Sequence, residues 1–503
     1  MGFFAVVVDG SSSAPCAPLA DRFEQIDLKD KEGIESFACS LQNEGRLGIM
    51  TAGTDFSATV AWVAERLGLP GIPYEAALNA SDKGRMRACF KQAGLPSPEF
   101  ITVTAADENI SPPAAFPLVV KPVDNMGGRG CRRVNNMEEL KEAIIDALRF
   151  SRSGRAIVEA FMEGPEFSLD AIVYHGEISV CGLADRHIFF PPYFIEMGHT
   201  MPAAIEVEKK EAILETFRAG IRALGLAGKG NVGAAKGDIK WSPKGPMIGE
   251  IAARLSGGYM SGWTYPYSSG LEPTRAAILA AMGRSPESLV PLKTWTSAER
   301  AFISIPGTVK TISGIDAARD KPYVRDILLR TVVGGKVSFP QNNIGKCGNV
   351  ISAAPDRASA AKAAETAARS ILIRLDTSDT ETAAFLSKES AFPPDAFQLG
   401  PELRAALDKL PEGVALFPVS GQDKKPEALE IIPFPELTAS GLRDYAGRTV
   451  EESLLIVRNL TGFPLMEAAA NADNKTTVLG RVFWAALVRG GYQGLLYCID
   501  SLL

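Results

Sequence analysis

Residues 238–250 read DIKWSPKGPMIGE, and this stretch decides how the rest of the chain is interpreted. Two short strands flank a Ser-Pro-Lys-Gly-Pro turn, and Asp238 and Glu250 lie at equal distances from its centre at Lys244. This register predicts two carboxylates that face each other across a hairpin. Like charges directly opposite on a ladder are destabilising. The pattern therefore predicts a cation between them, most plausibly Mg²⁺ if phosphates also bind.

The composition limits the class of protein. A chain of 503 residues is too long for one hydrophobic core, so we expect three or four domains. The net charge of -6 and the absence of Lys and Arg runs disfavour nucleic-acid binding. The seven cysteines form no CxxC pair and the three histidines have no zinc-ligand spacing, so we expect reduced thiols in a cytoplasmic protein. No stretch is typical of a signal peptide or a membrane span.

The pattern of apolar runs predicts an α/β and α+β multidomain protein. Residues 1–80 alternate short apolar runs such as LGIMTA with helical stretches, which is typical of a doubly wound parallel α/β domain. This domain lacks an evident first strand, so the native start could lie upstream. Ser81 is the predicted N-cap of the next helix, which Gly94 ends.

Residues 81–290 read as a second domain. It contains an apolar strand, the glycine loop DNMGGRG, an amphipathic helix, and an antiparallel hairpin about His175 and Gly176. A further α/β unit is predicted over residues 291–378, with an alanine-rich helix at 356–375. Residues 379–503 read as an additional, mostly helical domain whose role carries no recognisable motif. Its apolar helices favour packing on the core or a homodimer interface.

Two lysines are candidates for phosphate binding. Lys121 ends an apolar strand and precedes Gly127, Gly128 and Gly130, whose backbone N–H groups can turn toward phosphate oxygens. Lys83 lies in the first turn of a helix, where a cation is unfavourable with the helix dipole unless an anion is nearby. Each signal is weak alone, since a glycine turn after a strand is often structural and a lysine is often on the surface.

The order of these motifs along the chain is more specific. Lys83, then Lys121 with its glycine loop, then VEAFMEGPEFS, then the Asp238 and Glu250 hairpin ending in EIAARLSGG resemble the ATP-grasp superfamily over roughly residues 1–375. The resemblance implies an ATP-grasp fold over residues 81–290 with a lid at about 115–165, a preceding α/β domain, and a C-terminal lobe over residues 291–378.

The resemblance also implies roles for individual residues. Lys83 and Lys121 would hold the α- and β-phosphates of ATP, and the loop from Asn125 to Gly130 would close over them. Glu159 would lie near the adenine amino group, the backbone of Ala160 and Met162 would read the purine edge, and Glu166 would bind the ribose. Glu163 is taken as an ordinary strand-end carboxylate.

The same resemblance makes Asp238 and Glu250 ligands of Mg²⁺, which Mn²⁺ could replace, and Arg254 a contact of the γ-phosphate or of an acyl phosphate. One residue departs from the pattern E-x-N-x-R: Ala252 stands where relatives carry a metal-binding Asn. Water can complete a Mg²⁺ site, so Ala252 leaves the number of bound metals open. His199, Gly257 and Gly258 are candidates for the substrate pocket, whereas His175 and His187 are weaker ones.

The implied reaction is ADP-forming ligation of a carboxylate to an amine through an acyl phosphate. RLSGGYMSG and GTVKTISGID look most like carboxylate–amine ligases of the L-amino-acid-ligase type and are also similar to the carbamoyl-phosphate synthetase large subunit and biotin carboxylase. We therefore expect an amide-forming or dipeptide-forming ligase with small-molecule substrates. Two alternatives stay open: a bicarbonate-dependent carboxylase-type enzyme, and a nucleotide-binding regulatory protein without turnover.

Overall fold

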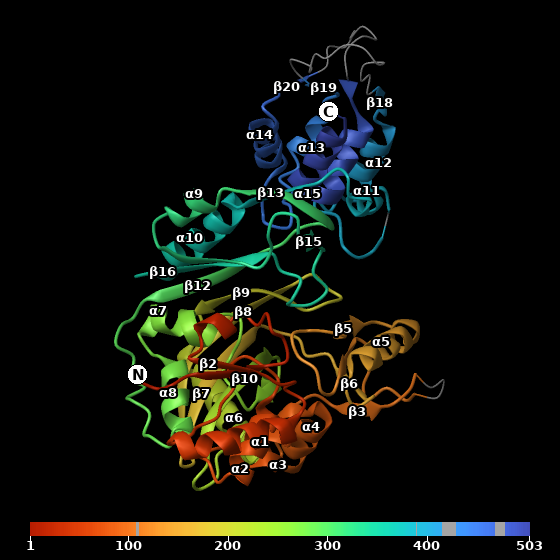
Figure 1. Ribbon diagram of the computed structural model, residues 1–503. Helices are drawn as coiled ribbons and strands as arrows, with labels where there is room; N and C mark the ends of the chain where they lie inside the picture. Colours follow the sequence, from red (N-terminus) through yellow and green to blue (C-terminus); the bar gives the residue numbers. More distant parts are fainter. Residues whose placement is uncertain (107–109, 389, 415–428, 468–477, 503) are drawn as a thin grey trace. The chain divides into compact units, whose positions relative to one another are not determined.

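The structure is a computed structural model, and it describes residues 1–106, 110–388, 390–414, 429–467 and 478–502. None of the helices within these ranges is long and apolar enough to cross a membrane. The chain forms two compact units, which are Met1–Glu299 with Ile351–Ala361, and Arg300–Val350 with Lys362–Leu503. Figure 1 shows the elements of both units, coloured along the sequence.

The first unit begins with a small α/β segment. Its elements are β1 (Val6–Asp9), η1 (Ala17–Leu19), β2 (Arg22–Gln25), α1 (Lys31–Leu41), η2 (Gln42–Glu44) and α2 (Ser57–Arg66). The two strands are parallel, as expected for an α/β domain. The apolar run at residues 47–52 forms no strand, and only Ala52 makes an isolated bridge, to Leu255. The prediction of a strand there is therefore wrong.

Two consecutive helices follow, α3 (Tyr74–Ser81) and α4 (Lys83–Gln92). The N-cap of α4 is Asp82, whose carboxylate accepts a 3.0 Å hydrogen bond from the Arg85 amide. The prediction of Ser81 as N-cap is wrong, because Ser81 belongs to the last turn of α3 and donates its hydroxyl to the Ala77 carbonyl. The correction matters because it makes Lys83 the first residue of α4.

A four-stranded sheet in the order β3-β6-β4-β5 carries one helix. Its elements are β3 (Phe100–Val103), β4 (Leu118–Pro122), β5 (Arg132–Val134), α5 (Met137–Phe150) and β6 (Ala156–Ala160). The N-cap Asn136 accepts a hydrogen bond from the Glu139 amide and starts α5 at the predicted residue. Leu140 and Ile144 of α5 pack on Val120 and Val158. The glycine loop connects β4 to β5 beside this core.

The main sheet of the first unit has the order β11-β10-β7-β8-β9-β12. These strands are β7 (Glu166–Tyr174), β8 (Glu177–Phe189), β9 (Ile195–Met201), β10 (Val232–Ser242), β11 (Gly245–Ala252) and β12 (Thr296–Phe302). The strands β7 and β8 pair as an antiparallel hairpin about His175 and Gly176, which confirms that prediction. The accompanying helices are α6 (Val207–Ala223), η3 (Met260–Thr264), α7 (Tyr265–Ser269) and α8 (Pro273–Ala281).

Alternation along β7, β10 and β11 gives the sheet two different faces. Leu169, Ile239 and Ile251 lie in one buried apolar cluster with Phe217 of α6. The residues next to Leu169 and Ile239 along their strands are polar and lie on the opposite face. The alternation therefore places polar residues of several strands next to one another on one face of the sheet.

The second unit contains a three-stranded sheet in the order β15-β13-β17. The elements from this part of the chain are β13 (Gly307–Ser313), α9 (Ile315–Arg319), β14 (Val324–Leu329), β15 (Lys336–Val337), β16 (Gly348–Ala354), α10 (Arg357–Ser370) and β17 (Leu372–Leu375). The helix predicted to run to residue 375 ends at Ser370, because the apolar residues after it pair with β13 as β17. That boundary prediction is wrong.

The C-terminal part of the second unit has its own apolar core. Its elements are α11 (Thr380–Ser387), α12 (Pro401–Lys409), β18 (Gly413–Val414), β19 (Leu429–Ile431), α13 (Pro435–Thr438), α14 (Val450–Thr461), β20 (Leu465–Glu467), β21 (Val478–Leu479) and α15 (Arg481–Leu502). Trp484, Leu487 and Leu495 of α15 are buried at its centre. A left-handed backbone at Gly491 kinks this helix.

Candidate active site

Polar side chains from five neighbouring strands, β11, β10, β7, β8 and β9, share one face of the main sheet. In the ladder, Asp238 lies opposite both Ser168 and Glu250, and Lys236 lies opposite both Asp170 and Ala252. A second row runs from Lys240 through Glu166 and Arg186 to His199. Residues directly opposite in an antiparallel ladder project from the same face. The strand alternation alone therefore brings four of the predicted site residues together, which are Glu166, His199, Asp238 and Glu250.

Asp238 and Glu250 are direct cross-strand partners, which confirms the predicted register. The register shifts after Asp238, so that Gly249 is the extra residue of a bulge. A Cβ at Gly249 would lie 3.0 Å from the Asp238 carbonyl oxygen, which explains why glycine occupies the bulge. The buried Arg87 of α4 donates a 2.5 Å hydrogen bond to the Gly249 carbonyl and so fixes the bulge from outside the sheet.

Both carboxylates of this pair are held in the ionised form by cations. Burial would raise the pKa of Glu250, but Lys83, Lys236 and Lys121 hold it far below its usual value. Burial likewise opposes ionisation of Asp238, yet Arg186 and Lys236 lower its pKa. Arg186 Nη1 lies 3.1 Å from Asp238 Oδ2, and the Ser168 hydroxyl donates to Asp238 Oδ1 at 2.9 Å.

Lys83 joins the carboxylate pair to the glycine loop. Its buried Nζ lies 3.1 Å from Glu250 Oε1 and donates a 2.8 Å hydrogen bond to the Asn125 carbonyl. Burial would lower the pKa of Lys83, but the carboxylates of Glu250 and Asp55 outweigh burial and raise it. A lysine of this kind is a fixed positive charge. It is not the solvated surface lysine that its position on a helix allows.

Lys121 is held by a buried carboxylate. Its Nζ lies 2.6 Å from Glu159 Oε2, and Arg87 Nε lies 2.7 Å from Glu159 Oε1. Burial would raise the pKa of Glu159, but Arg87 and Lys121 lower it. Two cations share one carboxylate here, so the cluster of Arg87, Lys121 and Glu159 keeps a net positive charge. That charge can attract an anion in front of Lys121.

The glycine loop adopts the backbone that the sequence predicts. Gly127, Gly128 and Gly130 all have φ between +65° and +78°, which is left-handed. A Cβ at Gly130 would lie 2.9 Å from Phe150 of α5, so glycine is required there for packing as well. A Cβ at Gly127 would meet nothing within 4 Å, so that position lies next to open space. Successive left-handed residues of this kind can aim backbone N–H groups at an anion.

The backbone amides of Ala160 and Met162, at the end of β6 and just after it, differ in their hydrogen bonding. The Ala160 amide donates to the Glu99 carbonyl at 2.9 Å within the sheet and is not available to a ligand. The half-buried Met162 is different, because no described residue accepts a hydrogen bond from its amide, while its carbonyl accepts one from Lys240. The carboxylate of Glu159 is already bonded to Arg87 and Lys121.

Glu166 is surrounded by charged side chains from the neighbouring strands. Arg186 Nη1 is bonded to Glu166 Oε1, and Lys240 Nζ lies 3.5 Å from Oε2. Arg186 also reaches Glu196 at 2.9 Å and Asp238 at 3.1 Å. Arg186 therefore links the predicted ribose-binding carboxylate to the predicted metal-binding carboxylate. The sequence analysis missed Arg186, since it belongs to no motif.

Lys236 is a second residue that the sequence analysis missed. Its Nζ is bonded to Asp238 Oδ2, and its direct cross-strand partner is Ala252. The methyl group of Ala252 leaves room for the long side chain of Lys236 across the ladder. The departure from the family pattern at residue 252 is therefore paired with a cation on the opposite strand. The strand spacing Lys236-x-Asp238 was the signal that could have revealed it.

His199 is buried between two carboxylates. Its Nδ1 lies 2.9 Å from Glu299 Oε2 and its Nε2 lies 3.7 Å from Glu196 Oε2. A Cβ at Gly258 would lie 2.7 Å from Glu196 Oε1 and 3.1 Å from the His199 ring, and Gly258 has φ +60°. Both the backbone and the close approach therefore require glycine at 258. His187 is bonded to Thr200 instead, and His175 is a turn residue with φ +51°.

Arg254 is buried just after β11, near the carboxylate pair. Its Nη1 donates to the Leu255 carbonyl at 2.9 Å, and its Nε has no hydrogen-bond partner within the described residues. Asp170 holds the same segment through a 2.7 Å hydrogen bond from the Ser256 amide. Burial raises the pKa of Asp170 to about 6. A buried guanidinium with an unsatisfied N–H is a group that can bind an anion.

The donor set of Asp238 and Glu250 fits a divalent cation of the Mg²⁺ type. Both groups are hard oxygen donors on one face, and the Glu250 side chain is 27% exposed, so a ligand can approach it. The methyl group of Ala252 offers no third donor. The remaining positions of an octahedral ion would therefore fall to water or to phosphate oxygens.

Two known protein families match parts of this chain. Residues 80–258 match the family described as ATP-grasp domain, and residues 301–376 match L-amino acid ligase C-terminal domain 2. A D-alanine–D-alanine ligase of Marinobacter nauticus is 36% identical over 131 residues, which are 25% of this chain and 39% of that protein. The uncharacterized protein y4rH of Sinorhizobium fredii is 27% identical over 64% of this chain and 67% of its own.

Among solved structures, an L-amino acid ligase from Bacillus licheniformis has a TM-score of 0.62 at 22% identity, covering 71% of this chain and 89% of that one. This likeness shows a shared fold. The matched part spans well under two thirds of the length of the D-alanine ligase relative. The chain therefore contains an ATP-grasp domain over residues 80–258 and an L-amino acid ligase C-terminal domain 2 over residues 301–376.

Proposed function

We propose that this protein is an ADP-forming, ATP-dependent carboxylate–amine ligase. The observation that carries the proposal is the position of Lys83, whose ammonium touches both Glu250 of the carboxylate pair and the Asn125 carbonyl of the glycine loop. A phosphate chain that replaced these contacts would lie between a metal-binding pair and a loop of backbone N–H groups. This arrangement suits phosphoryl transfer, in which catalysis is mostly positioning and charge stabilisation.

In this proposal, Lys83, Lys121 and the amides of Gly127, Gly128 and Gly130 bind the phosphates of ATP. The amide of Met162, for which the described residues offer no acceptor, supports a contact with the purine edge. Glu159 acts as the buried counter-ion of Lys121, so we replace its predicted contact with the adenine amino group by this positioning role. Glu166, oriented by Arg186 and Lys240, would accept the ribose hydroxyls.

Asp238 and Glu250 would hold Mg²⁺, which supplies neutralisation of the charge on the phosphate oxygens. Asp238 is fixed for this by Ser168 and Arg186. Lys236, opposite Ala252, supports a site with one metal ion, because its ammonium brings a positive charge to the place where the family pattern has a further ligand. We therefore propose that Lys236 takes over part of the phosphate neutralisation.

The proposed reaction has two steps. An oxygen of the substrate carboxylate attacks the γ-phosphorus, and the bond to the β-phosphate oxygen breaks, which gives an acyl phosphate and ADP. The amine nitrogen then attacks the acyl carbon, phosphate leaves, and the nitrogen loses a proton to form the amide. Arg254, with its unpaired Nε, would stabilise the negative charge at the acyl phosphate. His199 and Gly258 lie where the segment after Arg254 meets β9 and are the proposed wall of the acceptor pocket.

The substrates proposed are amino acids. The names of the relatives, a D-alanine–D-alanine ligase and an L-amino acid ligase, support this choice. The test is release of ADP and phosphate from Mg-ATP with a pool of the twenty amino acids, with mass spectrometry of the same sample. We expect release that depends on the pool and a product mass of two components less water. Release with bicarbonate alone would replace the proposal by a carboxylase, and nucleotide binding without release under any condition would replace it by a regulatory role.

A further inference from the structure

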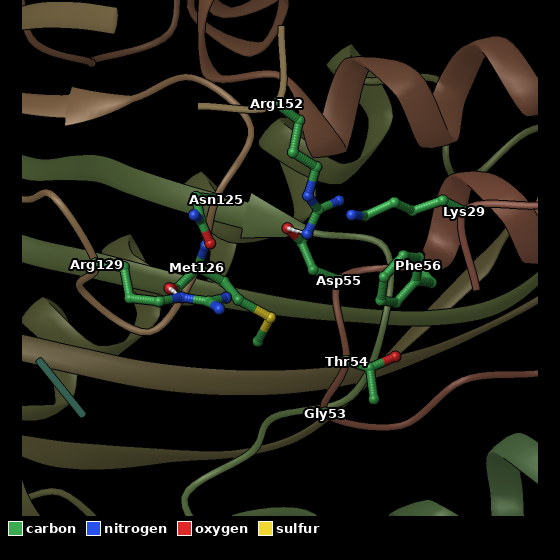
Figure 2. Close-up of a pocket in the computed structure, with 9 residues that line it drawn as sticks. All are labelled: Lys29, Gly53, Thr54, Asp55, Phe56, Asn125, Met126, Arg129 and Arg152. Carbon is green, nitrogen blue, oxygen red and sulfur yellow. Dashed lines mark hydrogen bonds and ion pairs between the residues drawn. The ribbon is translucent and has the colours of Figure 1, made fainter. Parts of the chain in front are cut away.

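A pocket of about 390 Å³ lies in the first unit beside the proposed phosphate site. Figure 2 shows its lining: the segment from Gly53 to Phe56, the glycine-loop residues Asn125, Met126 and Arg129, and the side chains of Lys29 and Arg152. The volume is at the lower end of small-molecule sites. Apart from the glycine loop, the lining belongs to none of the motifs of the sequence.

The pocket carries an excess of positive charge. Lys29, Arg129 and Arg152 line it against the single carboxylate of Asp55. Arg152 Nη2 lies 3.3 Å from Asp55 Oδ2, so this carboxylate is already shared. Among the described residues, neither Lys29 nor Arg129 forms an ion pair; Arg129 donates its Nε to the Met126 carbonyl, which carries no net charge. Like charges gathered in a small space repel one another, and an anion would relieve that repulsion.

The position of Arg152 is fixed by its surroundings. The Asp124 carboxylate accepts hydrogen bonds from the amides of Arg152 and Ser153 at 3.0 and 2.7 Å, so the backbone that carries Arg152 is held in place. The guanidinium of Arg152 lies 5.1 Å from the centre of the Phe56 ring, which orients it further. A guanidinium has five N–H donors, and its contact with Asp55 leaves others for a ligand.

The pocket is connected to the reaction site by contacts within the same unit. Ala52 bridges to Leu255, and a Cβ at Gly53 would lie 3.6 Å from Gly257 Cα. The segment that lines the pocket therefore runs beside Arg254, which is the proposed acyl-phosphate residue. Lys83 also contacts the Asn125 carbonyl, so the pocket and the proposed phosphate site share the start of the glycine loop.

We propose that this pocket binds a second anionic group of the acid substrate, so that the ligase activates a substrate with two negative charges. One carboxylate lies at Arg254 and reacts, while the second anion, a carboxylate or a phosphate, is held by Lys29, Arg129 and Arg152. Asp55 is the positioning residue of Arg152. This inference rests on the proposed function and specifies its substrate class.

Calorimetry on the protein saturated with Mg²⁺ and β,γ-methylene-ATP tests this proposal, because the analogue fills the γ-phosphate position. The probes are glutarate and 3-phosphonopropionate, which carry a second anionic group, and butanoate, which carries none. We expect at least one dianion to bind about tenfold or more tightly than butanoate. Comparison of glutarate with 3-phosphonopropionate identifies the preferred anion.

Two variants assign the preference to the pocket. Arg129→Ala and Lys29→Ala should each weaken binding of the preferred dianion about tenfold and leave butanoate unchanged. Arg149→Ala, which removes an exposed cation of α5, is the matched control and should change neither. Circular dichroism of each variant confirms that it folds.

Three results would overturn the proposal: no preference for a dianion in the wild type, equal dianion affinity in wild type and both variants, or an equal loss of β,γ-methylene-ATP affinity in Arg129→Ala. The last would assign the pocket to the phosphates of the nucleotide. Failure of the proposed function is read separately, as the absence of ADP release that depends on amino acids, whereas this test measures binding alone.

Discussion

The polar face of the main sheet and the core around α15 bury side chains by opposite means. At and around this face, Lys83 of α4, Asp238 of β10 and Glu159 of β6 are all less than 10% exposed, and each is matched by a charge from another element. Around α15, Trp484 and Leu487 are equally buried among apolar neighbours. Apolar burial stabilises a fold directly, whereas a buried ion pair loses most of its attraction to desolvation.

Apolar burial around α15 stabilises the fold, whereas the buried charges at the sheet face serve the chemistry of the site. A fold that needed only a core would gain by replacing Lys83 and Glu250 with apolar residues. The charges are retained at a site where phosphate and metal would replace the internal ion pairs. Arg489 of α15 is also buried, but it is bonded to backbone carbonyls and to Asp395 near the helix kink.

The largest expected effect comes from breaking the charged face. Lys121→Ala and Asp238→Asn should each lower ligase turnover by about 10³-fold, because they remove a phosphate contact and a metal ligand. Arg87 still compensates Glu159 in the first variant, so the protein should remain folded. Steady-state release of ADP measures the loss, and Lys91→Ala on the exposed side of α4 is the control. Full turnover in either variant would refute the site assignment.

The apolar core should respond in stability and not in nucleotide binding. Leu487→Ala should lower the free energy of unfolding of the second unit by about 2–5 kcal/mol, because it leaves a cavity in a fully buried position. Urea unfolding followed by circular dichroism and tryptophan fluorescence measures it, while affinity for an ATP analogue should stay within about twofold of the wild-type value. Val482→Ala, on the exposed side of the same helix, should change stability by less than about 0.5 kcal/mol.

Asp170 allows the stability cost of the charged face to be measured. Its pKa is about 6 when folded against an ordinary value of 3.8, so ionisation penalises the folded state. The penalty is absent below pH 3.8, grows between pH 3.8 and 6, and is complete above pH 6. Asp170→Asn should therefore stabilise the first unit by about 2–3 kcal/mol at pH 8 and by less at pH 5. Thermal unfolding at both pH values checks the sign, and destabilisation at pH 8 would contradict it.

The smallest expected effect concerns the metal. Ala252→Asn restores the amide of the family pattern, and we expect it to raise the stoichiometry of bound Mn²⁺ from one to two in the presence of β,γ-methylene-ATP, as read by electron paramagnetic resonance. Turnover should change by less than about tenfold, because Lys236 already neutralises charge there. Two metal ions in the wild type would show that Lys236 does not take the place of a ligand.

The sequence predicted the elements of the site better than their mutual contacts. The Asp238–Glu250 pairing was predicted from a turn centred on Lys244, although the turn lies between Ser242 and Gly245. The bulge at Gly249 compensates for that half-residue offset. In the hairpin about His175 a bulge follows Asp170 and moves Arg186 opposite Glu166, a register that simple counting does not give. Bulges depend on packing around them, which no local pattern encodes.

Contacts between side chains of different elements could not be predicted from the sequence for the same reason. Arg87 on α4 binds both Glu159 and the Gly249 carbonyl, and Lys236 faces Ala252 across the ladder. Their roles follow from tertiary contacts between segments up to 162 residues apart. The lysines and the glycine loop were predictable because phosphate binding needs cations and left-handed backbone close together in the sequence.

The central claim, an acyl phosphate formed at the polar face of the sheet, has one direct test. The protein is incubated with Mg-ATP and a pool of amino acids whose carboxyl oxygens are ¹⁸O, and the released phosphate is examined by mass spectrometry. We expect each phosphate released in amide formation to carry one ¹⁸O atom from the substrate carboxylate. Phosphate released without the label would show that water, and not a carboxylate, attacks the γ-phosphate, and would contradict the account.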